Sequence, residues 1–589
     1  MALPKEPLTR RTLLTGTAGV FAGSAGCLSR FQASVDRETP EQVTVSIATL
    51  PADENSVPVR IANHLAETLG VAGIDAGVQP VTAENLWRSL LLNQDFDLYI
   101  GQHPGYTDPD YLYGLLHSRF SEEPGWQNPF GYVNVPGMDD PLEAQRRART
   151  ADRADSLSEI VEAVREEVPF SVIAYPQEPR AVRTDRYSGW DYRSLESPVG
   201  YLALDERSGE EHNGRDAETL TVGITDRRIT HNLNPLAVEY RSRWIVTGLL
   251  YDSLGRRIDD EIEPWLARDW TWDGNRLQVE LRDGLTWHDG ETLTAADVAF
   301  TYRLLWDTTH TEGDPTVPAP CFRSRSTLVE NVEVTGERTI ELTTETDADH
   351  GLESAMVPVL PAHIWEERTD LTSIAGFDLD NATEALVDDN IEPVGSGPLR
   401  FDSVTADDRL ELVRNDDHFL TWIGNNDPLA ALAGGPPYER LVFIYSPSQA
   451  NVIEGVQAGD LDASADGVVP TEIERAEGAS EVELEFEDVS AYYHLGFNTR
   501  NAPLSNPRFR SAVSRLLDRE YLRTEVFDGY ATPAFSPIAM GGPEDEWEPN
   551  HRMGFIGESG TGAVDEETVH ELFREAGYIY NESGELVVR

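Results

Sequence analysis

Lysine is almost absent from this sequence of 589 residues, since Lys5 is the only one among 47 basic residues. The acidic residues number 104, which gives a formal net charge of −57. A surface with this charge repels nucleic acids and anionic membrane surfaces, so neither is expected as a partner. The acidic residues are scattered among apolar ones, as in residues 481–486, rather than gathered in blocks. This pattern is typical of a folded protein with a carboxylate-coated surface.

The same composition predicts a requirement for salt. At 1 M ionic strength the Debye length is about 3 Å, so multimolar salt screens the repulsion among the carboxylates. The excess of Asp and Glu combined with the scarcity of lysine resembles the proteins of salt-accumulating archaea. We therefore expect the protein to unfold when the salt is removed.

Cysteine is also scarce, because only Cys27 and Cys321 are present. Two cysteines cannot build a disulfide framework, least of all if one of them is modified. No histidine adjoins Cys321, which follows Val317-Pro318-Ala319-Pro320, so we interpret Cys321 as a small buried residue rather than a nucleophile.

Long apolar runs are missing beyond the N-terminus, so the body of the chain is not expected to cross a membrane. Thr9-Arg10-Arg11-Thr12-Leu13-Leu14 places paired arginines before a short apolar stretch, residues 13–25, and resembles a twin-arginine export signal. The stretch ends at Ser24-Ala25-Gly26-Cys27, which resembles a lipoprotein cleavage box. We predict a signal over residues 1–27, lipidation of Cys27 and a polar tether over residues 28–40. These features predict a protein on the extracellular face of the cell membrane, held there only by a lipid anchor.

Short apolar strands alternate with helical patterns along the rest of the chain, and this order indicates an α/β fold. The length exceeds what one compact core holds, so two or more lobes are expected. Helices are predicted over residues 59–69, 86–92 and 157–168, and another starts at Thr294, with Asp297 completing a capping box. The predicted strands are residues 43–50, 98–101, 171–175, 220–224, 277–281, 339–342 and 441–445.

Residues 249–306 carry the most specific motifs. They are Leu249-Leu250-Tyr251-Asp252-Ser253-Leu254, Pro264-Trp265-Leu266-Ala267, Arg282-Asp283-Gly284-Leu285-Thr286-Trp287-His288-Asp289-Gly290 and Leu293-Thr294-Ala295-Ala296-Asp297-Val298. Together with Tyr493-His494-Leu495-Gly496-Phe497-Asn498 further on, they resemble the family 5 solute-binding proteins of peptide, nickel and oligosaccharide ABC importers. The resemblance implies a two-lobed α/β fold of the periplasmic-binding-protein type (type II, the group of the peptide-binding proteins), with two chain crossings as a hinge.

The order of the family's elements is rotated in this chain. The elements that the family places last resemble residues 43–50, 59–69 and 101–111, which stand first here. We interpret this order as a circular permutation, with residues 205–217 as the linker that joins the family's old ends. One lobe is then predicted to span residues 172–497, and the other to combine residues 41–171 with residues 498–589. The crossings are predicted near Ser171-Val172 and Phe497-Asn498, and Glu41 is predicted to lie close to Arg589.

Ligand contacts in such folds come from cleft-facing loops and from the crossings. The residues predicted to contact a ligand are His103, Tyr106, Asp108, Asn234, Asn498, Arg500 and Phe535, while no metal ligand is predicted. For each of them a purely structural role, such as capping a helix or binding backbone groups, stays open.

One position bears directly on the ligand. Peptide-binding members of the family carry an aspartate three residues before the Asp-Pro pair, where it holds the amino terminus of the peptide. The equivalent position here is Gly105, so the resemblance does not extend to this amine anchor. The sequence around His103, with its tyrosines and tryptophans, also suits a hydroxylated or sugar-like solute. A peptide, an oligosaccharide or another small molecule therefore remain alternatives.

No motif of an enzyme stands out. The sequence contains no His-Glu-x-x-His, no paired cysteines and no Gly-x-Ser-x-Gly. We expect no catalytic residues and no cofactor. The prediction is a solute-binding protein that delivers its ligand to the permease subunits of an ABC importer, and the alternative is a surface sensor or scaffold that uses the same fold.

Overall fold

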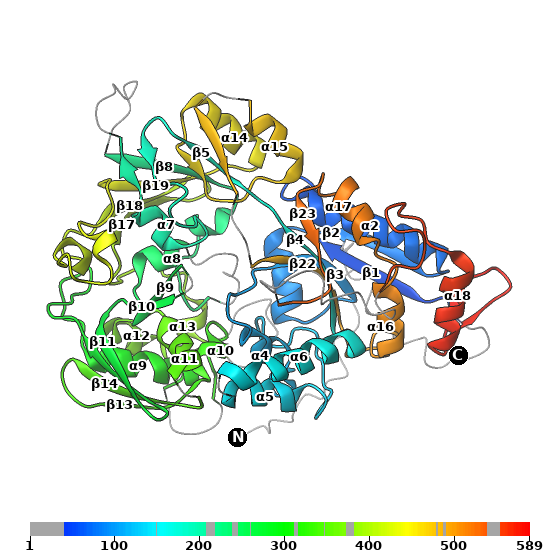
Figure 1. Ribbon diagram of the computed structural model, residues 1–589, viewed down its shortest axis with the longest axis horizontal. Helices are drawn as coiled ribbons and strands as arrows, with labels where there is room; N and C mark the ends of the chain where they lie inside the picture. Colours follow the sequence, from blue (N-terminus) through cyan, green and yellow to red (C-terminus); the bar gives the residue numbers. More distant parts are fainter. Residues whose placement is uncertain are drawn as a thin grey trace, which may run out of the picture.

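A computed structural model describes residues 41–148, 150–207, 218–237, 245–259, 261–310, 316–346, 348–372, 382–478, 481–486, 490–538 and 554–588. Two α/β lobes lie side by side around a cleft (Figure 1). The predicted signal, the tether with Cys27 and residues 208–217 of the predicted linker lie outside the described residues.

One lobe is built on a mixed six-stranded sheet that draws its strands from both ends of the chain. We call it the split lobe; its described residues fall within 41–176 and 492–588. Across the sheet the order is β2 (Asp75–Pro80), β1 (Thr44–Thr49), β3 (Leu98–His103), β22 (Tyr492–Phe497), β4 (Phe170–Pro176) and β23 (Ala531–Pro533). The first three strands are parallel, and the last three pair antiparallel with their neighbours.

The central strand β22 is buried along its whole length because helices cover both faces of the sheet. Alternate side chains of a strand point to opposite faces. Tyr493, Leu495 and Phe497 accordingly join the core formed with α2 (Ser56–Val71), while Tyr492 joins the core on the other face. The other helices of this lobe are α3 (Ala83–Trp87), α4 (Tyr111–Leu116), α5 (Asp139–Arg147), α6 (Thr150–Glu167), α16 (Pro507–Ser514), α17 (Arg519–Glu525) and α18 (Glu566–Glu575).

The other lobe, which we call the continuous lobe, spans residues 180–485 and contains two larger sheets. The seven-stranded sheet has the order β17 (Leu399–Thr405), β18 (Arg409–Arg414), β19 (Arg440–Tyr445), β8 (Thr219–Ile224), β20 (Ala463–Ser464), β5 (Arg180–Arg183) and β21 (Val482–Glu485). The four-stranded sheet has the order β11 (Ala267–Asp273), β12 (Arg276–Leu281), β14 (Thr339–Thr344) and β13 (Val329–Val334). Helices α7 (Pro198–Leu202), α8 (Ile245–Leu250), α10 (Arg323–Ser326), α11 (Ala348–Gly351), α14 (Gln449–Ala458) and α15 (Pro470–Ala476) complete the parts that matter for the cleft.

The local predictions hold closely in the described residues. Helix α9 (Ala295–Trp306) starts with the predicted capping box. The Asp297 side chain accepts a hydrogen bond from the backbone N–H of Thr294, and the Thr294 side chain accepts one from the backbone of the first helical turn. The seven predicted strands are present to within two residues at each end. The predicted helix at 86–92 is a short α-helix followed by a π-helical turn, residues 88–92.

The chain passes between the lobes at two places, and neither is where the sequence analysis expected it. Strands β4 and β22 both lie wholly in the six-stranded sheet, so the predicted crossings at 171–172 and 497–498 fall within it or at its end. In the described residues the chain leaves the six-stranded sheet after Pro176, through residues 177–179, and it enters this sheet again at Tyr492, after β21 of the other lobe has ended at Glu485. The reason for the difference is that a buried strand continues until its ladder of hydrogen bonds ends, and apolar composition does not reveal that point.

Both described ends of the chain meet in the split lobe. The Val43 N–H donates to the Leu586 carbonyl at 2.7 Å, and the Val588 N–H donates to the Glu41 carbonyl at 3.4 Å. The prediction that residues 43–50 share a lobe with residues 575–588 is therefore confirmed, while Arg589 lies outside the described residues. The circular permutation itself stays a prediction.

Candidate functional site

The cleft between the lobes has a volume of about 1050 Å³. Aromatic side chains from the split lobe, Trp87, Tyr106 and Trp126, face Tyr251 and Tyr445 of the continuous lobe across it. Residues of both crossings also line the cleft, so a movement at the crossings changes its width. A concave site lined by both aromatic and polar side chains is typical of small-molecule binding.

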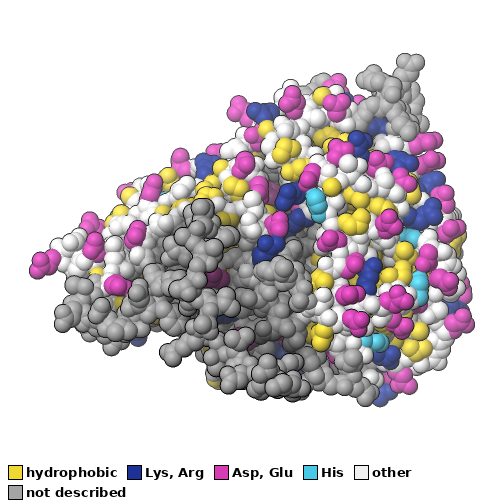
Figure 2. Space-filling model, turned by 180° about the vertical axis from the view of Figure 1, so that it is seen from behind, with side chains coloured by type: hydrophobic (Ala, Val, Ile, Leu, Met, Phe, Trp, Pro, Cys, Tyr) yellow, Lys and Arg dark blue, Asp and Glu magenta, His cyan; other side chains and the backbone are white. Residues whose placement is uncertain are grey.

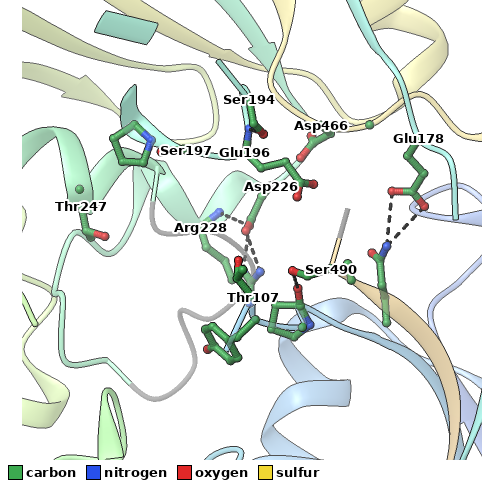
Figure 3. A pocket seen from close by; sticks show the side chains of 18 of the residues that line it. Thr107, Glu178, Ser194, Glu196, Ser197, Asp226, Arg228, Thr247, Asp466 and Ser490 are labelled. Atoms are coloured by element: carbon green, nitrogen blue, oxygen red, sulfur yellow. Dashed lines mark hydrogen bonds and ion pairs between the residues drawn. The ribbon is translucent and has the colours of Figure 1, made fainter. Parts of the chain in front are cut away.

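Carboxylates gather in one part of the cleft. Glu196, Asp226 and Asp466 face this part from the continuous lobe (Figure 3). Asp466 accepts hydrogen bonds from the backbone N–H and the hydroxyl of Thr225, at 2.6 and 2.7 Å, and Arg228 binds both oxygens of Asp226. These bonds hold the carboxylates in place before any ligand arrives.

Arginines line a different part of the cleft. Arg257 forms an ion pair with Glu353, and the Nε of Arg325 lies 3.6 Å from the same carboxylate. Arg256 is packed over the ring of Trp265, and burial lowers the pKa of its guanidinium to about 10. The site therefore offers both acidic and basic groups, carried on strand β9 (Gly255–Ile258), helix α10 and the neighbouring loops.

The loop after β3 brings three of the predicted residues together. His103 is buried and stacks with the rings of Tyr111 and Tyr492, each of whose centroids lies 5.2 Å from its own. Burial, with a smaller effect of His494, lowers the pKa of His103 well below its usual value, so its ring is neutral. Tyr106 and Asp108 line the cleft itself.

Asp108 joins the two lobes through charge. It binds Arg153 of its own lobe at 2.5 and 2.9 Å, and it lies 3.3 Å from Nδ1 of His350, which belongs to the continuous lobe. Burial opposes ionisation of Asp108, but the hydrogen bonds from His350 and Arg153 outweigh it and keep its pKa below the usual range. For His350, burial disfavours the charged ring, yet Asp108 and Asp110 raise its pKa to about 9. The ion pair is therefore fully charged at neutral pH.

A second set of contacts strengthens this junction. Arg146 binds both oxygens of Asp110 at 2.6 and 2.7 Å and also reaches the carbonyl of Ser324 in the other lobe at 2.8 Å. Arg323 of the continuous lobe binds both oxygens of Glu123 at 2.9 and 3.1 Å. These contacts lie between α4, α5 and α6 on one side and α10 and α11 on the other, and we call them the lobe junction (Figure 1).

The other four predicted residues do not line the cleft. The side-chain amides of Asn234 and Asn498 donate to backbone carbonyls of neighbouring loops, and both residues are buried. Arg500 likewise binds the carbonyls of two loops, and Phe535 lies beneath the guanidinium of Arg519. In this structure all four organise the interior of a lobe.

Sequence reasoning missed most of the residues that shape the site. They include Trp126, Glu178, Arg256, His350 and Glu353. Glu178 stands on a crossing, where it accepts a hydrogen bond from the Tyr493 hydroxyl at 3.0 Å, and its position beside Pro179 was the only signal that could have marked it. Of the remaining residues, Trp126 stands in a loop and the others in short helices or strands, and none belongs to a motif.

Gly105 is required by the backbone. Its φ is +63°, and a Cβ atom there would lie 1.9 Å from the carbonyl oxygen of Ser490. We expect Gly105→Ala to lower the free energy of unfolding by about 2–5 kcal/mol, because left-handed strain and a backbone clash add together. The measurement is a denaturant or thermal midpoint in high salt.

Gly274→Ala is the matched control. Gly274 has nearly the same φ, +66°, but nothing lies within 4 Å of a Cβ built there. It should cost only about 1 kcal/mol. Equal losses in the two variants would contradict the clash. The same geometry explains why no aspartate can stand at position 105.

Two structural features are absent from the described part of the chain. No helix there has the length and apolar character to cross a bilayer. No group of three or more His, Cys, Asp or Glu side chains in these ranges is arranged to hold a metal ion. On the face shown in Figure 2, acidic side chains are spread over the described surface rather than gathered into one patch.

Two lobes, two crossings and a cleft between the lobes with aromatic residues in its lining define a binding protein of the hinged class. The sequence profile of the bacterial extracellular solute-binding proteins, family 5 Middle, matches residues 261–588, more than half of the chain. The chain belongs to this family, which is a family of solute-binding proteins rather than of enzymes.

The relatives differ in what their names describe. The chain is 24% identical over 281 residues to the oligopeptide-binding protein AppA of Bacillus subtilis, covering 46% of this chain and 45% of AppA. It is 25% identical over 336 residues to heme-binding protein A of Haemophilus influenzae, covering 54% of each. The chain thus spans about half the length of the curated relatives it matches. Solved structures that are similar include AppA of B. subtilis with a nonapeptide (TM-score 0.45, 20% identity, 62% of this chain and 65% of that one) and NikZ of Campylobacter jejuni with Ni(L-His) (TM-score 0.45, 17% identity, 63% and 65%).

Proposed function

We propose that this protein captures a small solute in the cleft between its lobes and delivers it to the permease of an ABC importer. The observation that carries the proposal is the cleft of about 1050 Å³, which both lobes and both crossings line. A site made by two lobes closes when the lobes move together, and closure buries the solute on all sides. Residues 177–179 and the described residues 490–491 act as the hinge.

The solute contacts in this proposal come from the loop after β3 and from the facing lobe. Tyr106 and Trp126 supply aromatic walls, while Asp108 keeps the loop tied to His350. His103 supports the loop from beneath, because its Nδ1 accepts the N–H of Gly105 at 2.9 Å. Asn234, Asn498, Arg500 and Phe535 support the lobes without touching the solute.

The aspartate that anchors the amine of a peptide in peptide-binding relatives is missing from this cleft. The position from which peptide-binding relatives hold an amine is Gly105 here, and its backbone leaves no room for a side chain. The relatives named above include an oligopeptide-binding and a heme-binding protein, so family membership alone does not select a ligand.

The proposal extends to export and anchoring. The paired arginines and Cys27 of the first 27 residues support secretion by the twin-arginine route and attachment to lipid, with residues 28–40 as the tether. The acidic composition supports a life in high salt. The rotated order of elements supports a circularly permuted family member whose tether leaves from the split lobe.

Mass spectrometry of small molecules released by denaturing the protein, purified from its own host in high salt, tests the function. We expect a defined solute in near-stoichiometric amount from the wild-type protein. In Tyr106→Ala the dissociation constant of that solute should rise at least tenfold, which corresponds to a loss of about 1.4 kcal/mol of binding free energy, and less solute should be retained.

Tyr580→Ala is the matched control, since Tyr580 is a partly buried tyrosine that does not line the cleft. It should retain the solute. A released peptide would mean that another group replaces the lost amine anchor, whereas a sugar or another neutral solute would mean a changed substrate. An empty cleft in every preparation would contradict capture for transport and favour a sensor or scaffold.

A further inference from the structure

A second, smaller cavity lies beside the cleft at the lobe junction. Its volume is about 60 Å³, and its walls come from both lobes. It shares Tyr106, Asp108, Trp126, Arg325 and Glu353 with the lining of the main cleft. A solute held in the cleft can therefore extend one end group into this cavity, which we call the side pocket.

Two buried polar groups of the side pocket lack hydrogen-bond partners among the described residues. Trp126 is 7% exposed, and its Nε1–H has no acceptor. Gln127 is 4% exposed, and its Oε1 has no donor. Buried donors and acceptors nearly always have hydrogen-bond partners in folded proteins, because a buried polar group without a partner costs free energy. A partner for either group has to come from outside the described residues.

His103 adds a second donor. Its ring lines the side pocket and packs against the ring of Trp126, with centroids 4.6 Å apart. Its Nδ1 accepts the N–H of Gly105, so the proton of the neutral ring is on Nε2. The pocket thus offers two neutral N–H donors and one amide acceptor.

The charged groups around the side pocket already have ionic partners. Asp108 is bound by Arg153 and His350, and Asp110 by Arg146. Arg323 binds Glu123, while Arg325 lies 3.6 Å from Glu353. A charged end group would enter without a counter-charge of its own and would disturb these pairs.

We propose that the side pocket receives a neutral end group of the solute, a hydroxyl or a carboxamide, which accepts from Trp126 Nε1 and donates to Gln127 Oε1. The inference rests on the proposed function and specifies the class of solute. The volume agrees, because a water molecule occupies about 30 Å³ in the liquid. A hydroxymethyl or carboxamide group fits in about 60 Å³. The pocket selects such an end group and rejects a carboxylate of similar size.

Calorimetric titration in high salt with matched probes tests this. The probes are alanyl-asparaginyl-alanine, alanyl-aspartyl-alanine and alanyl-leucyl-alanine, together with maltose and the corresponding uronate. Wild-type protein should bind the asparaginyl peptide, the disaccharide or both at least tenfold more tightly than the charged or apolar analogue. Trp126→Phe and Gln127→Met should each remove most of that discrimination.

Trp422→Phe is the control, because Trp422 is 49% exposed and lines neither cavity. The solute-free Gln127→Met protein should have a thermal midpoint at least as high as that of the wild type, because the substitution removes a buried acceptor whose hydrogen bond is unmade. Probe binding with equal affinities across each series, or discrimination unchanged in both variants, would overturn the side pocket and leave solute capture intact. Failure of every probe to bind the wild-type protein would overturn both for these solute classes.

Discussion

Replacing Arg146 with methionine should lower the free energy of unfolding by about 3–5 kcal/mol, because it leaves Asp110 buried without its principal counter-charge. The Arg146 side chain is 1% exposed, binds both oxygens of Asp110 and lies over the ring of Tyr113 at 3.5 Å. It also binds Ser324 and Thr327 of the other lobe. The variant should therefore show an earlier midpoint in denaturant and, by small-angle scattering, a more open arrangement of the lobes.

The neighbouring residue offers a matched control. Arg147 stands on the same helix but is 60% exposed, and it pairs with Glu143 one turn away. Arg147→Met should change stability by less than about 1 kcal/mol, because exposed pairs are weak. Similar losses in the two variants would show that the burial of the Arg146–Asp110 pair does not matter.

Removal of salt should have the largest effect of any change in conditions. The net charge is −57, and the Debye length grows from about 3 Å at 1 M to about 10 Å at 0.1 M. Repulsion among surface carboxylates then reaches across several neighbours at once. We expect dialysis to about 0.05 M salt to unfold the protein, or to lower its thermal midpoint by at least about 10 °C.

The control for this experiment separates the screening of charges from the stabilisation that any cosolvent excluded from the protein surface provides. Sucrose at high concentration strengthens apolar burial but screens no charge. It should not replace the salt, whereas NaCl and KCl at equal concentration should act alike. A cooperative unfolding transition that is unchanged at low salt would contradict the prediction. Salt screens the buried pairs of the lobe junction much less than it screens surface charges. Removal of salt should therefore increase the repulsion at the surface before it affects the junction.

The two predictions concern different parts of the same charge distribution. At the surface, acidic side chains are far more numerous than basic ones and depend on the solvent for compensation. At the lobe junction, each buried carboxylate has its own partner, Arg146 for Asp110 and Arg153 with His350 for Asp108. The junction can thus hold the lobes together even where the surface repels itself.

Much of the fold was readable from the sequence because its signals are local. The capping box of α9 involves Thr294 and Asp297, three residues apart, and the strands appear as short apolar runs bounded by turns. The motifs over residues 249–306 pointed to the family, and the family profile covers residues 261–588. The meeting of residues 43–50 with residues 575–588 followed from the order of the family's elements rather than from any pattern in either segment.

The functional site was only partly readable for the opposite reason. Asp108 stood out beside a proline, but its partner His350 is 242 positions away, and no spacing rule connects them. Asn498 and Arg500 looked like cleft residues at a crossing, yet they bind loop carbonyls inside the split lobe. Trp126 and Gln127 carry no motif at all.

The sequence by itself determined the class of fold, the family, the net charge from which the salt dependence is predicted, and the absence of a side chain at position 105. Only the tertiary structure decided which polar groups meet across the lobes, where the chain crosses between them and which buried donors and acceptors are left for a solute. The physical reason is the separation along the sequence between the residues that interact. Helices, strands and caps are set by atoms within a few residues of one another. The cleft and the side pocket arise where segments hundreds of residues apart pack together, and the free energies that place them there depend on the whole fold.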